Sequence, residues 1–175
     1  HVDAMRLLLE KGAAVDQAME DGRTPLFIAC DKGHVDAARL LLAKGAEVDR
    51  AMNDGRTPLY AACEMGHVNA ARLLLEKGAE IDRAEKKHGW TPLYAACRNG
   101  HVDAARLVLE KGAAVNRATN DGWTPLHIAC QNDRHCTSVD ASRRVDAARL
   151  LLAKGAAVDR ATEKGATPLF IACEN

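Results

Sequence analysis

The sequence predicts an all-α solenoid, in which short helix pairs stack along a single array of 175 residues. The main observation is internal repetition, because the tripeptide Thr-Pro-Leu recurs at steps of 33, 34, 33 and 43 residues. Its copies begin at Thr24, Thr57, Thr91, Thr124 and Thr167. The second observation is composition: only 3% of the residues are aromatic, and a core rich in Ala and Leu favours closely packed helices.

Two further motifs keep the same period. The motif Val-Asp/Asn-Ala-Ala-Arg-Leu begins at Val35, Val68, Val102 and Val145. The tripeptide Lys-Gly-Ala recurs from Lys11 to Lys154. The longer steps correspond to one extra residue near Lys87 and ten extra residues after Cys130. This regularity is typical of repeat proteins, whose units bury their apolar faces by stacking on one another.

Each unit is expected to begin with a tight turn and a short helix. Asp-Gly dipeptides such as Asp54-Gly55 favour the turn, because Gly tolerates positive φ and Asp bonds its own backbone. Thr57 is the predicted helix cap, and Pro58 takes the first helical position, where a missing N–H is harmless. The sequence predicts this helix over residues 58–65, with Gly66 as its C-terminal cap.

A second helix is predicted to follow, from His67-Val68 to Lys77. Val68, Ala71, Leu74 and Leu75 form one apolar stripe at helical spacing. In the sister units an acidic residue opens this helix and a lysine closes it, which suits the helix macrodipole. An extended segment then leads to the next turn, so each unit is predicted to be a turn followed by two helices.

These residues and their spacing resemble the ankyrin-repeat family, whose signature is Thr-Pro-Leu-His-x-Ala on a 33-residue period. The resemblance extends over almost the whole chain and implies an ankyrin-repeat solenoid, with helix pairs joined by β-hairpin loops. We expect partial repeats over 1–18 and 162–175 and full repeats over 19–51, 52–84, 85–118 and 119–161, the last with the ten-residue insertion. Because both ends are partial units without polar caps, we expect further repeats to flank this array.

The chain departs from the family signature at its histidine, which is kept only as His127. The equivalent positions hold Phe27, Tyr60, Tyr94 and Phe170. The family uses this histidine to bond the Thr hydroxyl, so four units are expected to lack that bond. Asn116 holds a position where family members often carry Asn, some of them hydroxylated, and we expect a structural hydrogen bond from it.

The periodic cysteines are interpreted as small core residues. They are Cys30, Cys63, Cys97, Cys130 and Cys173. Zinc takes about four ligands in a tetrahedron, whereas Cys63 offers it only one further ligand nearby, His67, which begins the next helix. We therefore expect no metal and no disulfide, and buried free thiols indicate an intracellular, most simply cytoplasmic, location.

The ten-residue insertion lies within residues 131–144, where it replaces the turn between two helices. A tolerated surface loop is the plainest interpretation, because long insertions cost little entropy per added residue. A partner-specific contact loop and a redox-sensitive thiol at Cys136 are the alternatives. His135 beside Cys136 is not by itself a catalytic dyad, since such partners meet in space.

The resemblance implies that partners bind the concave face, around the hairpin glycines and at the ends of the first helices. Side chains at these positions vary between units while the frame stays constant. The candidates are Arg23, Asp31, Lys32, Arg56, Glu64, Met65, His88, Trp90, Arg98, Asn99, Trp123, Gln131 and Asn132. The alternative is that many of them are solvated surface, because few residues of an interface carry most of its energy.

The two tryptophans, Trp90 and Trp123, follow the hairpin glycines of neighbouring units. They are either anchors for a partner or packing residues against the next hairpin. Arg23 and Arg56 hold the same position in the preceding units. A groove with an arginine half and a tryptophan half would favour a partner that is acidic at one end and apolar at the other.

Composition and motifs narrow the function to protein binding. The 24 basic and 24 acidic residues cancel, which argues against nucleic acid or an anionic membrane as the partner. Phosphate loops, paired-carboxylate motifs and nucleophile motifs are missing from the sequence, so we expect neither an enzyme nor a cofactor. We expect a scaffold, adaptor or regulatory module. The alternatives are a recruiting or regulatory segment of a larger enzyme, or a structural spacer that self-associates head to tail through uncapped ends.

Overall fold

The computed structural model describes residues 2–131 and 138–174. Its helices, in chain order, are α1 (Val2–Glu10), α2 (Pro25–Asp31), α3 (Val35–Ala43), α4 (Pro58–Glu64), α5 (Val68–Glu76), α6 (Pro92–Arg98), α7 (Val102–Glu110), α8 (Pro125–Cys130), α9 (Ser138–Ala153) and α10 (Pro168–Cys173). Every regular element in these residues is a helix, which confirms the all-α prediction.

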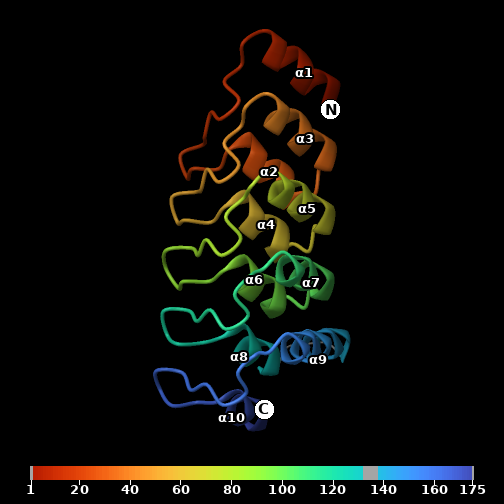
Figure 1. The fold of residues 1–175 in the computed structure, drawn as a ribbon. Helices are drawn as coiled ribbons and strands as arrows, with labels where there is room; N and C mark the ends of the chain where they lie inside the picture. The colour runs from red at the N-terminus through yellow and green to blue at the C-terminus, as the bar shows by residue number, and fades with distance from the viewer. Residues whose placement is uncertain (1, 132–137, 175) are drawn as a thin grey trace.

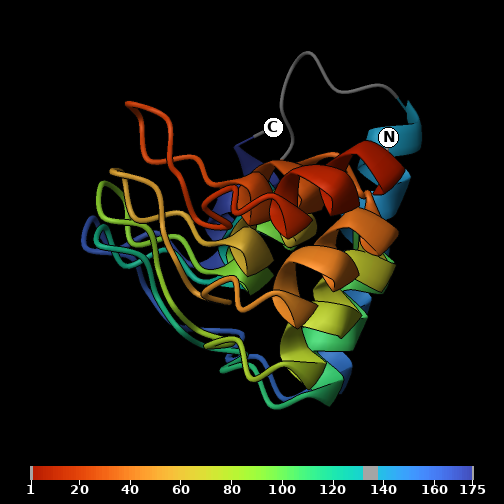
Figure 2. The same ribbon diagram turned by 90° about the horizontal axis from the view of Figure 1, so that it is seen from above.

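The helices are stacked in pairs along one elongated array (Figure 1). We call the pairs α2–α3, α4–α5, α6–α7 and α8–α9, each with the hairpin that precedes its first helix, units 1 to 4, and α10 with its hairpin opens unit 5. Each first helix packs on the first helix of the next unit, and each second helix does the same. Seen from above, the hairpin loops extend to one side of both helix layers (Figure 2). The core therefore lies between the layers, and the loops form a separate projecting row.

The first helix of each unit begins as the sequence predicts. Thr57 is extended, and its Oγ1 accepts a hydrogen bond from the backbone N–H of Tyr60 at 3.1 Å. The helix ends at Glu64, one residue earlier than predicted, because Met65 is the cap and Gly66 already has a φ of 72°. The short helix thus holds its C-terminal residue at the surface beside the hairpin.

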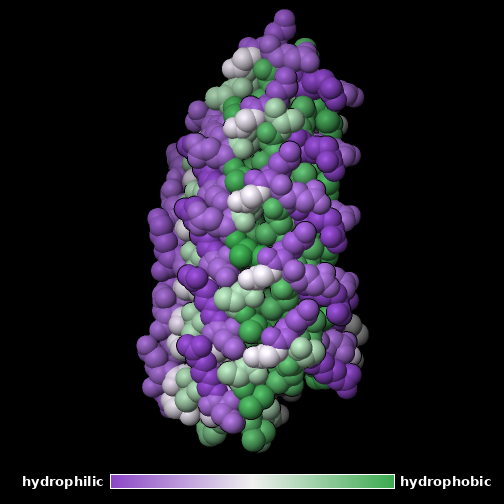
Figure 3. Space-filling model, in the orientation of Figure 1, coloured by the Kyte–Doolittle hydropathy of each residue, from purple (hydrophilic) through white to green (hydrophobic). Residues whose placement is uncertain are grey.

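The second helix has a broader buried face than the predicted stripe. Ala70, Ala71, Leu73 and Leu74 are buried in α5, while Val68 and Leu75 are only partly buried. The reason is that α5 packs on α4 and also on the neighbouring helices α3 and α7, so that more than one side of it is covered. Figure 3 shows hydrophobic residues continuing as a band from unit to unit on one face of the array.

The connecting segments tie each unit to the next through one side-chain position. A carboxylate or amide oxygen accepts the backbone N–H of a residue in the following unit. The pairs are Asp16 with Glu47, Asp49 with Glu80, Asp82 with Ala114, and Asn116 with Ala157. Asn116 makes the expected structural bond, at 2.8 Å from the N–H of Ala157. This hydrogen bond explains why an Asn or Asp is found at each of these positions.

The hairpin loops are joined into a ladder without forming strands in the described residues. Within unit 1, Met19 N–H bonds Arg23 O at 3.0 Å and Gly22 N–H bonds Met19 O at 2.9 Å. Between units, single backbone bonds run from Asn53 to Asp21, Lys86 to Asp54, Asn120 to His88 and Glu163 to Asp121. Each hairpin therefore uses backbone groups at its tip to hold its neighbour.

The cysteine prediction is confirmed for three of the five periodic positions. Cys30, Cys63 and Cys97 are buried free thiols, and burial raises the pKa of each to about 12. Cys130 is half-buried and Cys173 is exposed. The prediction of a core position is wrong for Cys173, since no described helix packs over it.

The insertion is in part a helix, and not only a loop. Helix α9 begins at Ser138 and is 16 residues long, whereas α7 has 9 residues. The segment from Ser138 to Ala153 contains no Gly or Pro, so the helix extends backwards into the inserted residues. Asn132, His135 and Cys136 lie outside the described residues. No helix of the described chain is long and apolar enough to cross a membrane.

Candidate protein-binding surface

In units 1 and 2 the hairpin tips carry ion pairs between residues two apart. Arg23 Nε lies 2.6 Å from Asp21 Oδ2, and Arg56 Nε lies 2.8 Å from Asp54 Oδ2. Each aspartate also accepts the backbone N–H of its arginine. This N–H bond is the main cause that lowers the pKa of Asp21. The two pairs stabilise their own turns, so their charges are largely satisfied within the chain.

In unit 3 the same two positions hold stacked rings. The rings of His88 and Trp90 are 4.8 Å apart, and those of Trp90 and Tyr94 are 5.5 Å apart. The guanidinium of Arg98, at the end of α6, lies over the Trp90 ring with 4.8 Å from its carbon to the centroid. Within the described residues Arg98 forms no ion pair. Unit 3 thus presents aromatic surface and one cation that has no carboxylate partner among the described residues.

Glu85 holds the turn of unit 3 in the absence of the Asp–Arg pair. Its carboxylate accepts the backbone N–H groups of Lys87, His88 and Trp90, at 2.7, 2.6 and 3.2 Å. Glu85 is buried, and sequence reasoning missed it. A signal was present: the position is Met19 and Met52 in units 1 and 2 but polar in unit 3. A polar residue there indicates a side chain that bonds the turn.

In unit 4 the hairpin aspartate has no basic residue two positions later. Asp121 is exposed and is followed by Gly122 and Trp123. Thr119 Oγ1 accepts the N–H of Trp123 at 3.1 Å and takes the structural role of the missing pair. The ring of Trp123 lies 5.8 Å from that of His127. Unit 4 therefore adds a second indole and a carboxylate without a basic partner in its hairpin.

The side chains of units 3 and 4 border one hollow of about 300 Å³, which we call the aromatic hollow. It is lined by His88, Trp90, Tyr94, Arg98, Thr119, Asp121, Trp123, Ile128 and Gln131. A second hollow of about 470 Å³ lies next to it and shares Asp121 and Trp123. Phe170 and Glu174 of unit 5 border its other side. Residues of units 3, 4 and 5 therefore border two adjoining hollows, which together we call the groove.

The aromatic hollow brings together five of the residues expected from the sequence: His88, Trp90, Arg98, Trp123 and Gln131. Asp121 also belongs to the hairpin positions at which contacts were expected, whereas Tyr94, Thr119 and Ile128 line the hollow without having been expected.

The other candidates lie elsewhere in the described chain. Asp31 pairs with Lys32 at 3.0 Å, and Glu64 pairs with Arg56 at 3.4 Å. Asn99 donates to the backbone oxygen of Glu64 at 2.9 Å. Met65 is exposed and borders a separate hollow beside His101 and Arg143. The structure does not describe Asn132.

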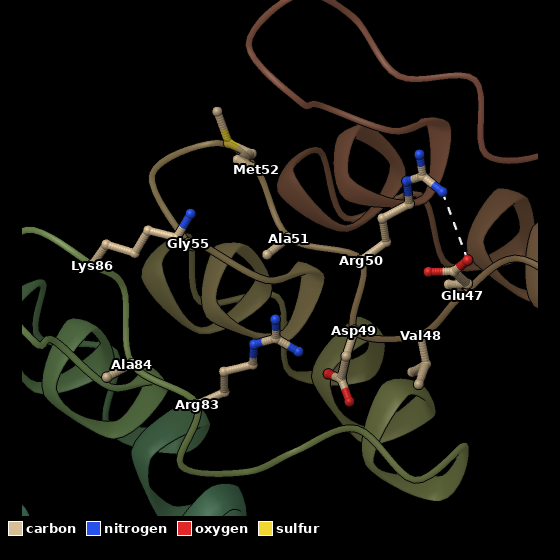
Figure 4. A pocket seen from close by; sticks show the side chains of 10 residues that line it. All are labelled: Glu47, Val48, Asp49, Arg50, Ala51, Met52, Gly55, Arg83, Ala84 and Lys86. Carbon is tan, nitrogen blue, oxygen red and sulfur yellow. Dashed lines mark ion pairs between the residues drawn. The ribbon is translucent and has the colours of Figure 1, made fainter.

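A larger hollow, of about 670 Å³, lies between the connecting segments of units 1 and 2 (Figure 4). It has basic residues at its rim, but their charges are engaged. Arg50 lies 3.6 Å from Glu47, Arg83 lies 3.9 Å from Glu80, and Lys86 donates to the backbone oxygen of Asn53 at 3.0 Å. It also lacks aromatic side chains. Volume alone therefore does not make it the better binding site.

The comparisons with known proteins agree with this architecture. The model for three copies of the ankyrin repeat matches residues 1–85 and 81–141, and the model for a single ankyrin repeat matches residues 121–163. The chain belongs to the ankyrin-repeat family. A comparison with curated proteins gave no match. Ankyrin repeats are in general protein–protein interaction modules. In the described residues, no three His, Cys, Asp or Glu side chains are grouped in a way that could hold a metal ion.

Proposed function

We propose that this array is a protein-interaction module, acting as a scaffold, adaptor or regulatory segment, and that the aromatic hollow is its main contact surface. The observation that carries the proposal is the contrast between hairpin tips. Asp21 with Arg23 and Asp54 with Arg56 satisfy each other, whereas Trp90 and Trp123 turn partly exposed indoles to a groove. Exposed aromatic and arginine side chains next to a hollow are the residue types that dominate binding energy.

We propose Arg98 as the contact for a partner carboxylate, in place of Arg23 and Arg56, which the sequence suggested. Arg23 and Arg56 are held by Asp21, Asp54 and Glu64, so a partner carboxylate would have to displace an existing pair. Arg98 is pre-oriented by the ring of Trp90 and has no such competitor in the described residues. A stacked guanidinium loses less side-chain freedom when it binds a carboxylate.

Two other roles are compatible with the same chain. A recruiting or regulatory segment of a larger enzyme would use the same surface, and the enzymatic part would lie in other residues. A self-associating spacer is favoured by exposed apolar side chains on the outermost helices, including Leu8 on α1 and Leu169 and Phe170 on α10. The proposal also includes an intracellular, cytoplasmic location, supported by the buried thiols of Cys30, Cys63 and Cys97.

The test is an affinity capture with three immobilised proteins, followed by mass spectrometry. They are the unchanged chain, the Trp123→Arg variant, and Arg23→Ala as a surface control outside the hollow. Arginine is the native residue at the position of Trp123 in units 1 and 2, so this variant keeps the turn chemistry of the array. We expect a partner that is retained by the unchanged chain and by Arg23→Ala and lost by Trp123→Arg. Equal capture by all three would remove the aromatic hollow as the surface.

Light scattering separates the spacer from the module. A spacer shows a mass that grows with concentration and returns to the monomer after Leu169→Asp. A module shows a monomer at all concentrations, with the same Trp123-dependent partner.

A further inference from the structure

We infer that the aromatic hollow binds a partner segment in the polyproline II conformation, with an acidic residue at the Arg98 end of the segment. This inference rests on the proposed function and names the class of its partner. The starting point is that the aromatic hollow and its neighbour share Trp123, so that Trp90, Trp123 and Phe170, from three successive units, all line the groove. The partner must present side chains at the period of the array.

That period matches polyproline II. Helices α6 and α8 pack directly on each other, and packed helices have axes about 8–10 Å apart. Trp90 and Trp123 occupy equivalent positions in these two units, so their backbone positions recur at about the same distance. A polyproline II segment presents every third residue on one side, with a spacing of about 9 Å. A β-strand presents residues on one face at about 6.5 or 13 Å, which misses this period.

The backbone of the hairpins also disfavours a bound strand. Strand addition requires a free row of N–H and C=O groups. Here the tips of adjacent hairpins already bond one another, with Asn120 N–H on His88 O at 2.8 Å and Glu163 N–H on Asp121 O at 3.2 Å. A polyproline II segment forms no internal hydrogen bonds and needs no such row. Its carbonyl groups need single donors instead.

The two indole N–H groups are suitable donors. In the described residues, the hydrogen bonds of Trp90 and Trp123 involve their backbone groups, and neither indole N–H donates to a protein group. Aromatic side chains with a polar edge at a groove are the usual means of binding proline-rich segments, since the ring packs on the pyrrolidine and the N–H bonds a carbonyl.

An α-helix fits less well. Residues seven apart on a helix recur at about 10.5 Å, which is close to the period, but a helix with side chains is about 10–12 Å across. The aromatic hollow, of about 300 Å³, has room for one or two side chains, so a helix would lie outside it and contact it through side chains alone. A helix also satisfies its own carbonyl groups and leaves the two indole donors without acceptors.

Charge sets the direction of the segment. Arg98 borders only the aromatic hollow, Asp121 borders both hollows, and Glu163, Lys164 and Glu174 border only the second hollow. A carboxylate on the partner is attracted to Arg98 and is repelled from the second hollow, where Glu163 and Glu174 outnumber Lys164. The inferred segment therefore has an acidic residue beside the position that contacts Trp90, and apolar residues or prolines three apart from there.

The experiment is a selection of short random peptides displayed on phage, with the unchanged chain and Trp123→Arg as parallel baits. We expect the unchanged chain to enrich sequences with prolines or apolar residues three apart and an Asp or Glu on one flank. Binding of each selected peptide is then titrated by the fluorescence of Trp90 and Trp123, the only tryptophans of the chain. Each Pro→Ala change in the peptide is expected to weaken binding by about two- to fivefold, through lost pre-organisation.

Arg98→Glu is the matched charge variant, and we expect it to shift the selected flank from acidic to basic residues. The inference would be overturned by peptides that need Trp123 for binding but lack the three-residue spacing. It would also be overturned if the affinity of the selected peptides did not change after Pro→Ala. The absence of any enriched peptide would overturn it as well. In those cases a partner captured from cells and lost by Trp123→Arg would still support the proposed function, so the two failures can be told apart.

Discussion

Arg98 lies over the ring of Trp90, whereas the equivalent residues of the preceding unit, Glu64 and Arg56, form an ion pair at 3.4 Å. The two units thus join the same two positions by different interactions. In unit 2 the cation is in the hairpin and the anion is at the helix end. In unit 3 the cation, Arg98, is at the helix end, and the hairpin supplies the aromatic ring of Trp90. The side chain at the helix end therefore determines whether the hairpin residue of the same unit is engaged within the chain.

The first prediction is a measurable interaction energy between Trp90 and Arg98. A double-mutant cycle of Trp90→Ala and Arg98→Ala, followed by urea unfolding, is expected to give about 0.5–1 kcal/mol of favourable coupling in the folded chain. Trp90→Ala alone should cost more, because it also removes the stacking on His88 and Tyr94. Glu110→Ala on α7 is the control. Additive effects of the two substitutions would contradict a stacked guanidinium.

The second prediction concerns the stability of Trp123→Arg. The new arginine follows Asp121 by two residues, as Arg23 follows Asp21, and is expected to form the same hairpin ion pair. Exposed pairs contribute about 0–1 kcal/mol, which offsets part of the lost ring contact with His127. We expect the free energy of unfolding to change by less than about 1 kcal/mol. A larger loss in urea unfolding would mean that Trp123 is mainly a packing residue.

Most of the fold could be predicted from the sequence because the repeat makes each local signal appear several times. Thr57 followed by Pro58 has equivalents in all the other units, and Gly66 after the first helix has equivalents in Gly33 and Gly100. The error at Ser138, where an expected loop is helical, has a physical reason. Inserted residues have no equivalents for comparison, and helix propensity continues backwards wherever Gly and Pro are missing.

The candidate site was less predictable from the sequence, because it depends on which pairs of side chains interact with each other. Sequence reasoning treated Arg23 and Arg56 as free cations, since the list of variable positions does not show which side chains satisfy each other. Glu85 was missed because one extra residue near Lys87 hides its alignment with Met52. Both features depend on distances across a turn, and periodicity alone does not provide them.

The third prediction is that Asp49→Asn stabilises the array at neutral pH. Asp49 Oδ2 accepts the N–H of Glu80, but its Oδ1 is buried without a partner, and burial raises the pKa of this carboxyl above its ordinary value of 3.8. Asn116, at the equivalent position, keeps the same bond and also donates to Gly155 O at 3.4 Å. Asparagine at position 49 should therefore add about 1 kcal/mol in urea unfolding at pH 7.

The sign of the pH dependence follows from the raised pKa of Asp49. The folded chain binds the proton more tightly than the unfolded chain, so the charged carboxylate begins to oppose folding as the pH rises through the ordinary value of 3.8, and the cost is complete above the raised pKa. The advantage of Asp49→Asn should therefore be largest at neutral pH and shrink as the pH falls through the acid range. Asp49→Ala, which loses the bond to Glu80, is the destabilised control. An advantage that is constant with pH would contradict this cause.

The fourth prediction assigns a pH dependence to His127. Its ring is buried, its Nδ1 accepts the N–H of Thr124 at 3.1 Å, and its Nε2 donates to Ala166 O at 3.1 Å. Burial is the main cause that lowers the pKa of His127 below its ordinary value of 6.5. The stabilisation is therefore complete above pH 6.5 and is lost as the pH falls towards the lowered pKa.

His127→Phe tests this directly, because Phe27 is the native residue at that position in unit 1. The variant should be less stable by about 1–2 kcal/mol at pH 7.5, since it leaves Thr124 N–H and Ala166 O without the ring. The deficit should narrow at about pH 5, where the unchanged chain must protonate a buried ring. Urea unfolding at both pH values measures it. Parallel pH profiles of the two proteins would exclude His127 as the titrating group.

The fifth prediction uses two glycines to measure the fit between units 2 and 3. Gly66 and Gly78 have φ values of 72° and 86°, so alanine is strained at both by about 1–2 kcal/mol. A Cβ on Gly78 would meet nothing within 4 Å, whereas a Cβ on Gly66 would lie 2.5 Å from Nδ1 of His101 in the next unit. Gly66→Ala should therefore cost about 1–3 kcal/mol more than Gly78→Ala in urea unfolding.

The second half of this test removes the obstacle. In a His101→Ala background the added methyl group at position 66 has space, so the excess cost of Gly66→Ala over Gly78→Ala should fall close to zero. Retention of the full excess would mean that the strain at Gly66 is a property of its own backbone. Its loss would show that the ring of His101 transmits the shape of one unit to the next, which is the nearest-neighbour coupling that gives a repeat array its cooperativity.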